Sequence, residues 1–254
     1  MTVRAGSFVL LCVVLAACAA DLRAQPSSGT IMAIFAHPDD ERIVGPILAR
    51  YAREGRQVFL VIATDGSKGV REHAGIPAGA ALAEARAEEA RCAARALGIQ
   101  PPILLGLEDG GLATFASLGR LRDEIVRALV THEPAMLLTI GPEGGTGHPD
   151  HRLVGNVVTE VVQGMIGSPP SLYYPSLPTE RMRTAQPYSP RYTTIPARYL
   201  TVQVPFEPRD LDAGRTAFAC HASQYTAEER APIDAALRHG FDGRVHLRPW
   251  NGGR

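Results

Sequence analysis

The sequence predicts an α/β fold of the Rossmann-like type, in which a mostly parallel sheet is flanked by helices. From Thr30 onward, short apolar runs alternate with longer segments of helical periodicity, the pattern of βαβ units around a parallel sheet. The chain has 254 residues, of which 45% are hydrophobic, so it can bury an ordinary core. Its formal net charge is +0, which indicates no basic surface for nucleic acid.

The first residues are expected to be a leader rather than part of the fold. Arg4 precedes the apolar stretch Phe8–Ala17, which is shorter than the roughly 20 residues of a membrane-spanning helix and is typical of a signal peptide. Leu15-Ala16-Ala17-Cys18 resembles a bacterial lipobox, which predicts a lipid on Cys18. We therefore predict an exported protein, held at the membrane by that lipid or, alternatively, secreted. The predicted divisions are a signal peptide over residues 1–18, a tether over 19–29 and one domain over 30–254.

The predicted strands and helices follow one another along the domain. The strands are predicted at Ile31–Phe35, Val58–Thr64, Ile103–Leu105, Ala135–Ile140, Leu172–Tyr174 and Tyr199–Val204. The helices are predicted at Gly45–Glu54, Ala80–Leu97, Leu118–Val130 and Leu153–Met165. Pro46 suits the first turn of its helix. The segment from Tyr174 to Arg198 is rich in proline and tyrosine and is expected to be a long loop, in which Tyr173, Tyr174, Tyr188 and Tyr192 could stack on a sugar.

Two cysteines, Cys92 and Cys220, lie within the predicted domain. In an exported protein two thiols can pair, but the positions along the chain do not show whether they meet. We expect both to be free, buried cysteines.

The first chemical motif is Ala36-His37-Pro38-Asp39-Asp40-Glu41, directly after the predicted strand Ile31–Phe35. In open α/β sheets, ligands bind at the carboxyl ends of the strands. A histidine and two aspartates at that position can supply two metal ligands and a general base from a single turn.

A second motif, Gly141 to His151, follows the predicted strand Ala135–Ile140 and includes His148-Pro149-Asp150-His151. Because parallel strands end at the same edge, the two motifs can converge. His37, Asp40 and His151 would then form a two-nitrogen, one-oxygen set for zinc, with a coordination position left open for water. The glycines could instead hold a phosphate, but the lysine of a P-loop is missing.

The predicted helix Ala80–Leu97 has a charged pair within its apolar stripe, Arg86 and Glu89. Charges on a buried face are costly unless they are paired or face a polar cavity. Two interpretations remain open on the pattern alone. The residues form a mutual ion pair, or Arg86 reaches a site and Glu89 orients it.

The two motifs together resemble the PIG-L/LmbE-like family of zinc-dependent deacetylases, which act on N-acetylglucosaminyl groups and related N-acyl substrates. The resemblance extends from about Thr30 to about Tyr225. It implies that His37, Asp40 and His151 bind Zn²⁺ and that Asp39 is the general base. It also implies that His148 polarises the amide carbonyl of the substrate.

Further residues take roles from the same resemblance. Arg86 matches a family arginine that contacts substrate, in an Arg-x-x-Glu element completed by Glu89. Asp109 resembles a substrate-side aspartate of the family. His221-Ala222-Ser223-Gln224 resembles a later family element, for which we predict a supporting role. Separately, we expect Asp150 to orient one of the two histidines that flank it, His148 or His151.

The resulting hypothesis is a zinc-dependent hydrolase that removes an acetyl group from an N-acetylglucosamine-type or related N-acyl substrate, either a small molecule or a glycan. The alternative is a surface-anchored carbohydrate-binding protein that has a zinc site but no turnover. A serine hydrolase using Ser223 and His221 is disfavoured, because no Gly-x-Ser-x-Gly motif surrounds the serine.

Overall fold

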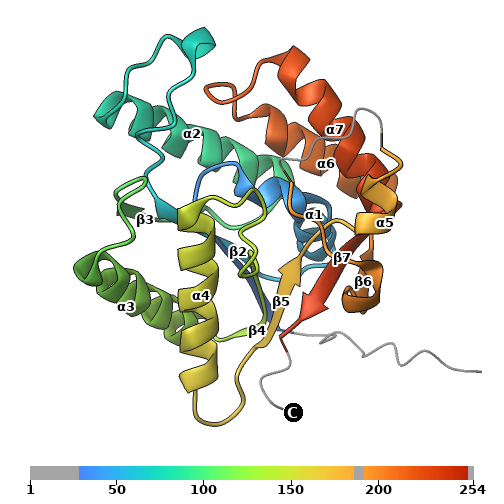
Figure 1. Cartoon of the computed structure of the whole chain (residues 1–254). Coiled ribbons are helices and arrows are strands. Elements are labelled where there is room, and N and C mark those ends of the chain that lie inside the picture. The colour runs from blue at the N-terminus through green and yellow to red at the C-terminus, as the bar shows by residue number, and fades with distance from the viewer. Residues whose placement is uncertain (1–28, 186–191, 251–254) are drawn as a thin grey trace, which may run out of the picture.

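The computed structural model describes residues 29–185 and 192–250 (Figure 1). The predicted signal peptide, the predicted lipidation site Cys18 and all but the last residue of the predicted tether lie outside the described residues. So does Tyr188. Within the described part, no helix is both long enough and apolar enough to cross a membrane.

The strands form a mixed sheet of seven in the order β3-β2-β1-β4-β5-β7-β6. They are β1 (Thr30–Phe35), β2 (Val58–Thr64), β3 (Ile103–Leu107), β4 (Pro134–Thr139), β5 (Ser171–Pro175), β6 (Val202–Pro205) and β7 (Arg244–Pro249). β1 pairs in parallel with β2 and β4, and the parallel pairing continues to β3 and β5. β7 pairs antiparallel with β5 and β6. This arrangement confirms the predicted α/β fold with a mostly parallel sheet.

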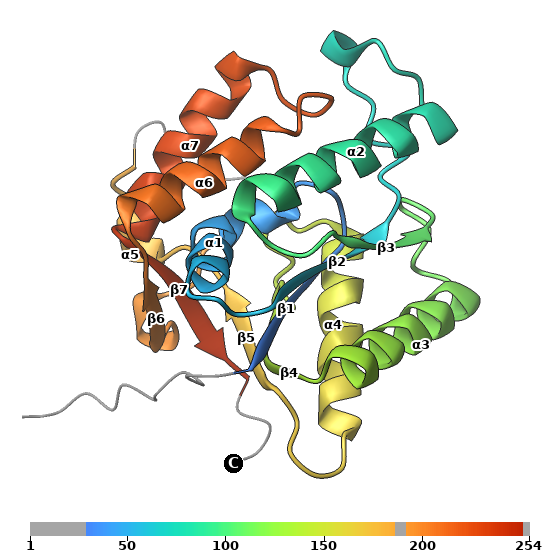
Figure 2. The same ribbon diagram turned by 180° about the vertical axis from the view of Figure 1, so that it is seen from behind.

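Helices cover both faces of the sheet (Figures 1 and 2). They are α1 (Gly45–Arg53), α2 (Ala80–Leu97), α3 (Phe115–His132), α4 (Pro149–Gly164), α5 (Thr179–Met182), α6 (Pro208–Ala219) and α7 (Ala227–Phe241). The core on one face joins the sheet to α1, α2, α6 and α7. The core on the other face joins it to α3 and α4.

The central strand β1 shows why its sequence is a continuous apolar run. Ile31, Ala33 and Phe35 pack into the core shared with α1 and α2, whereas Met32 and Ile34 pack into the core shared with α3 and α4. Successive side chains of a strand point to opposite faces, so a strand covered on both faces needs apolar residues throughout.

The second half of the chain contains the largest differences from the sequence prediction. Strand β7 and helices α5, α6 and α7 were not predicted, although α6 and α7 each begin with a capping box. Tyr173 and Tyr174 lie buried in β5, so they are not free to stack on a sugar as expected. Helix α4 begins at Pro149, four residues before its predicted start, because Pro149 occupies the first helical turn.

The expectation of two free cysteines was wrong. Cys92 on α2 and Cys220 at the end of α6 form a disulfide. Helices α2 and α6 pack against one another on the same face of the sheet, and this brings together two residues separated by 128 positions. The pairing depends on the packing of α6 against α2, which the spacing of the two cysteines along the chain does not show.

The strand order places the chemical motifs at the turning point of the fold. From β1 the chain passes outward through β2 to β3, and β4 then lies on the other side of β1. A reversal of this kind leaves a crevice outside the carboxyl ends of the two central strands. The loops after β1 and β4, which contain the two predicted motifs, border this crevice.

Candidate active site

The loop after β1 turns sharply and brings the side chains of His37, Asp39 and Asp40 close together. Asp39 has a φ of 112°, a left-handed backbone conformation that non-glycine residues seldom adopt. The backbone N–H of His37 donates to Asp40 Oδ2 at 2.9 Å. Residues Asp40–Ile43 then form a single 3-10 turn. The turn keeps His37, Asp39 and Asp40 together and buried.

The loop after β4 presents two histidines from the start of α4. His148 is the N-cap of this helix, and its Nδ1 accepts a hydrogen bond from the N–H of Asp150 at 3.2 Å. His151 lies in the first turn, with its Nδ1 3.0 Å from the carbonyl oxygen of Gly144. That contact leaves Nε2 of His151 directed at the loop after β1.

The three predicted metal ligands come together. Nδ1 of His37 lies 3.1 Å from Nε2 of His151, and the same His151 atom lies 3.2 Å from Asp40 Oδ1. Nδ1 of His37 is 3.7 Å from Asp40 Oδ2. Two imidazoles and a carboxylate, all buried, thus lie in mutual contact.

Other possible ligands surround the same histidine. Among the described residues, possible ligand atoms lie within 4.8 Å of one another in two groups, His37 with His148 and His151, and His37 with Asp109 and Asp150. Nε2 of His37 is buried and lacks a hydrogen-bond partner of acceptable geometry, although it lies 3.2 Å from Asp109 Oδ1. His37 is therefore the centre of the donor cluster.

The electrostatics of this cluster suit a bound cation. Burial lowers the pKa of His37, but the carboxylates of Asp109, Asp150 and Asp40 outweigh that effect and raise the pKa to about 11. Burial in turn raises the pKa of Asp109, and contact with His37 overrides it and lowers the pKa to about 2. A metal ion in place of the His37 proton would balance the same carboxylates, since metal binding displaces protons from its ligands. The donor set therefore fits a metal.

Asp39, the predicted base, lies beside the cluster and has its own partners. The hydroxyl of Tyr225 donates to Asp39 Oδ2 at 3.0 Å. Nη1 of Arg42 lies 3.3 Å from Asp39 Oδ1 and donates to the Asp39 carbonyl oxygen. Burial and the adjacent carboxylate raise the pKa of Tyr225, which keeps the phenol protonated and able to donate.

His148 is exposed at the rim of the cleft. Burial of part of the ring lowers its pKa, and the neighbouring His37 and His151 lower it further. The imidazole is therefore neutral near pH 7. Because Nδ1 accepts the hydrogen bond from Asp150 N, the proton of the neutral ring resides on Nε2, which can donate to a ligand.

Arg86 and Glu89 contact separate parts of the site rather than each other. The guanidinium of Arg86 donates to the carbonyl oxygens of Pro38 at 2.6 Å and Gly66 at 3.1 Å. It also lies 3.7 Å from Asp39 Oδ2. Arg86 thus holds the loop after β1 through its contacts with Pro38 and Asp39. It also lines the cleft.

Two glycines provide the space for this buried guanidinium. A Cβ added to Gly66 or to Gly69 would lie 2.6 Å from Arg86 Nη1, closer than side-chain packing permits. The position of Arg86 therefore depends on glycine at both positions of the loop after β2.

The remaining predicted residues line the opposite side of His37. Asp109 Oδ2 accepts from the backbone N–H of Lys68 at 3.0 Å, and Asp150 Oδ2 accepts from that of Gly110 at 2.7 Å. Asp150 Oδ2 also lies 3.4 Å from Nε2 of His37. The Asp150 carboxylate therefore contacts His37, and not one of the flanking histidines as expected, and it joins the loop after β3 to α4.

Two hollows meet at the donor cluster. An open cleft of about 210 Å³ is lined by Asp39, Arg86, Asp109, His148 and Tyr225 among others. A more enclosed pocket of about 60 Å³ lies beside it. Four residues line both hollows, namely Asp40, Arg42, Thr146 and His151.

Sequence reasoning missed Arg42 and Tyr225, both of which contact Asp39. Tyr225 directly precedes the capping box formed by Thr226 and Glu229 at the start of α7. That capping box was a readable signal for α7 and for an ordered residue before it. No local signal connects Tyr225 to Asp39, which lies 186 positions away.

Fold and site together define an α/β protein with a histidine and carboxylate centre at the carboxyl edge of its sheet. The chain belongs to the PIG-L family, described as GlcNAc-PI de-N-acetylase, whose sequence model matches residues 32–162. It is 33% identical over 174 residues to a 1D-myo-inositol 2-acetamido-2-deoxy-alpha-D-glucopyranoside deacetylase of Mycobacteroides abscessus. That match covers 61% of this chain and 62% of the relative, so less than two thirds of the relative's length is spanned.

Solved structures share the fold at low sequence identity. The N,N'-diacetylchitobiose deacetylase from Pyrococcus horikoshii superposes with a TM-score of 0.70 at 20% identity, over 89% of this chain and 85% of that one. The 4-carboxy-2-hydroxymuconate hydratase from Pseudomonas putida superposes with a TM-score of 0.62 at 17% identity, over 87% and 95% of the two chains. Because one neighbour is a deacetylase and the other a hydratase, the fold alone does not define the reaction.

Proposed function

We propose that this protein is a zinc-dependent deacetylase that hydrolyses the N-acetyl amide of an N-acetylglucosamine-type or related N-acyl substrate. The observation that carries the proposal is the position of Asp39. Its carboxylate lines an open cleft directly beside the converging donor atoms of His37, Asp40 and His151. Membership of the PIG-L family and the name of the Mycobacteroides abscessus relative support this choice of reaction.

The metal ligands in this proposal are His37, Asp40 and His151. Asp40 is favoured over His148 as the third ligand because its carboxylate contacts both of the other ligands and is itself held by His37 N. Nitrogen and oxygen donors of this kind suit zinc. When bound, Zn²⁺ would polarise the amide carbonyl as a Lewis acid and lower the pKa of water.

Asp39 is the proposed general base. It takes a proton from the attacking water and later returns that proton to the departing amine. The hydrogen bond from Tyr225 and the ion pair with Arg42 hold the carboxylate in one orientation. An oriented base beside the substrate avoids the cost of organising a solvent molecule for each turnover.

His148 is the proposed donor to the developing oxyanion. Its neutral ring has Nδ1 engaged by the helix cap, so Nε2–H is free to face the carbonyl oxygen of a substrate in the cleft. A donor of this type stabilises the transition state more than the ground state. Its proton is already in place before substrate binds.

Substrate hydroxyl groups are proposed to meet Asp109 and Arg86, which line the same cleft as His37 and Asp39. The guanidinium of Arg86 already donates to Pro38 and Gly66. Arg86 would therefore have two roles, because it would bind the substrate and it also holds the loop that contains Asp39.

We also propose that the protein works outside the cytoplasm, anchored through Cys18. The disulfide between Cys92 and Cys220 supports this location, because disulfides persist mainly in oxidising compartments. The test is fractionation of cells expressing the full chain. Recovery of a lipid-labelled form in membranes is expected, and loss of the label in Cys18→Ala is the control.

The activity is tested with the zinc-loaded protein on free, oligomeric and lipid-linked N-acetylglucosamine, following acetate release. Hydrolysis of at least one substrate is expected, with loss on chelation and recovery when zinc is added back. Retention of activity after complete chelation would contradict the metal requirement. Stoichiometric zinc with no acetate release from any substrate would favour the carbohydrate-binding alternative instead.

A further inference from the structure

The segment from Cys220 to Tyr225, which connects α6 to α7, reaches the candidate base from two directions. At its far end the Tyr225 hydroxyl donates to the Asp39 carboxylate. Near its start, His221 contacts Glu41, whose carboxylate accepts a hydrogen bond from the backbone N–H of Asp39. We name residues 220–225 the strap.

The contact through Glu41 is completely buried. Nε2 of His221 lies 2.6 Å from Glu41 Oε1, and His221 and Glu41 are 0% and 2% exposed. The other oxygen, Glu41 Oε2, accepts from Asp39 N at 3.0 Å. This N–H belongs to the residue with a φ of 112°, so the hydrogen bond holds a backbone conformation that an aspartate rarely adopts by itself.

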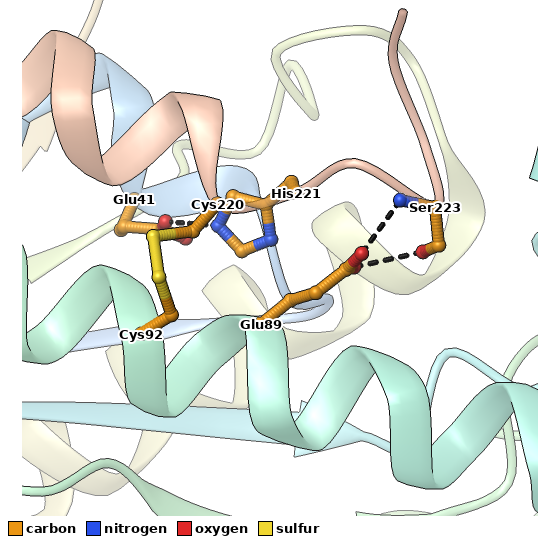
Figure 3. Close-up of a disulfide and its surroundings, with 6 residues drawn as sticks. All are labelled: Glu41, Glu89, Cys92, Cys220, His221 and Ser223. Carbon is orange, nitrogen blue, oxygen red and sulfur yellow. Dashed lines mark hydrogen bonds and ion pairs between the residues drawn. A yellow bond between two sulfur atoms is a disulfide. The ribbon is translucent and has the colours of Figure 1, made fainter.

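The strap is fastened to α2 at two points (Figure 3). Cys220 is bonded to Cys92. Three residues further on, Ser223 donates through its backbone N–H and its hydroxyl to the two oxygens of Glu89, at 2.6 and 2.7 Å. His221 lies between these two attachments and is directed toward Glu41.

We propose that His221 is a positioning residue that acts through Glu41 on the backbone of Asp39, and that the Cys92–Cys220 disulfide fixes the strap for this purpose. The inference rests on the proposed function for its activity readout, because the residue that the strap orients, Asp39, is the general base of the proposed reaction. It also explains Glu89, whose carboxylate serves the strap rather than Arg86.

A purely stabilising role makes a different prediction. If the strap only adds stability, any loss of equal stability elsewhere on α6 would have the same effect. Arg53→Ala provides that comparison, because Arg53 on α1 binds Asp210 on α6 through two hydrogen bonds far from the strap along the helix. A positioning role predicts that only the strap variants change turnover.

The test uses four variants. One is a double variant that carries both Cys92→Ala and Cys220→Ala, and the others are His221→Leu, His221→Gln and Arg53→Ala. Metal content, kcat and KM are measured on the substrate found for the wild type. We expect His221→Leu to lower kcat about 100-fold, in line with the effect of a misplaced catalytic group, with metal content and KM nearly unchanged. The cysteine variant should lose roughly tenfold in kcat. His221→Gln, which keeps a donor for Glu41, should recover part of the loss.

Amide hydrogen exchange of the peptide containing residues 37–44 provides a readout that needs no turnover. Faster exchange is expected in the cysteine variant and in His221→Leu, and unchanged exchange in Arg53→Ala. The proposal is overturned if the cysteine variant and His221→Leu both keep wild-type exchange and kcat within twofold of the wild type. If His221→Leu does not fold, wild-type exchange and kcat in the cysteine variant overturn it. If the wild type itself hydrolyses no substrate, the proposed function fails, while the exchange measurement still decides whether the strap positions Asp39.

Discussion

The two halves of the molecule contribute differently to the same site. The parallel half, from β1 to the first turn of α4, supplies the donor atoms and the candidate base from loops at one edge of the sheet. The second half supplies Tyr225 and His221, which contact Asp39 and Glu41 from outside. The parallel half therefore contains the candidate reactive groups, and the second half adds contacts that help to orient the candidate base.

This difference indicates that residues that would take part in the reaction can be distinguished by experiment from residues that only hold them in position. Residues of the parallel half should affect metal content or turnover when changed, with little dependence on the rest of the chain. Residues of the second half should change turnover only where they reach Asp39 directly, as Tyr225 does, or through Glu41, as His221 does. The predictions below test this separation, beginning with the largest expected effect.

Asp39→Asn should produce the largest loss of turnover with the metal retained. Replacing a general base by a group that cannot accept a proton typically costs about 1,000-fold, and Asn keeps the volume of the side chain. The measurement is kcat together with zinc content by elemental analysis. His37→Ala is the contrasting variant and should lose the metal itself. Near-normal turnover in Asp39→Asn would remove this residue from the mechanism.

His148→Ala should have the next largest effect. Removal of one donor to a developing oxyanion costs about 100-fold in kcat, whereas the N-cap that the ring provides to α4 affects mainly stability. His148→Asn is the matched control, because it restores an N-cap without the reach of Nε2. Equal activity of the two variants is expected. Recovery of full activity in His148→Asn would show that the ring acts only as a cap.

The two candidate metal-binding motifs could be predicted because each one is local. His37 follows β1 directly, His151 lies in the first turn of the helix after β4, and parallel strands end at the same edge. Strand and helix positions in the parallel half were recovered for the same reason, since continuous apolar runs and helical periodicity are properties of short windows. The position of β1 between β2 and β4 then follows from the general topology of such sheets.

The second half could not be predicted in the same way, because its contribution depends on contacts between distant residues. Cys220 meets Cys92 only once α6 packs on α2, and no spacing in the sequence records that packing. His221 was assigned a supporting role from its resemblance to the family, but its partner Glu41 became visible only in three dimensions. The motif that contains His221 therefore indicated a supporting role but did not identify the residue that His221 contacts.

Tyr225→Phe is expected to have a smaller effect than either active-site variant. It removes one hydrogen bond to Asp39 Oδ2 while Arg42 remains beside the other oxygen. A hydrogen bond of this kind contributes about 1 kcal/mol, or roughly fivefold in kcat if all of it acts on the base. Steady-state kinetics with zinc content as the control measures it. A loss as large as that of Asp39→Asn would mean that Tyr225 takes part in the chemistry and that the separation of the two halves is incomplete.

Arg53→Ala should have the smallest effect, on stability alone. Burial raises the pKa of Asp210, but the hydrogen bonds from Arg53 outweigh it and the pKa is lowered overall. A carboxyl whose folded-state pKa is lowered contributes stability above its unfolded pKa of about 4, and loses that contribution as the pH falls through the folded value. The wild type should therefore be more stable than Arg53→Ala at pH 7, and the difference should shrink below about pH 4. Urea denaturation of both proteins across this range measures the difference. Because the ion pair joins α1 to α6 away from the strap, kcat should stay at the wild-type value, and a fall in kcat at pH 7 would show that support of α6 in general, rather than the strap, controls Asp39.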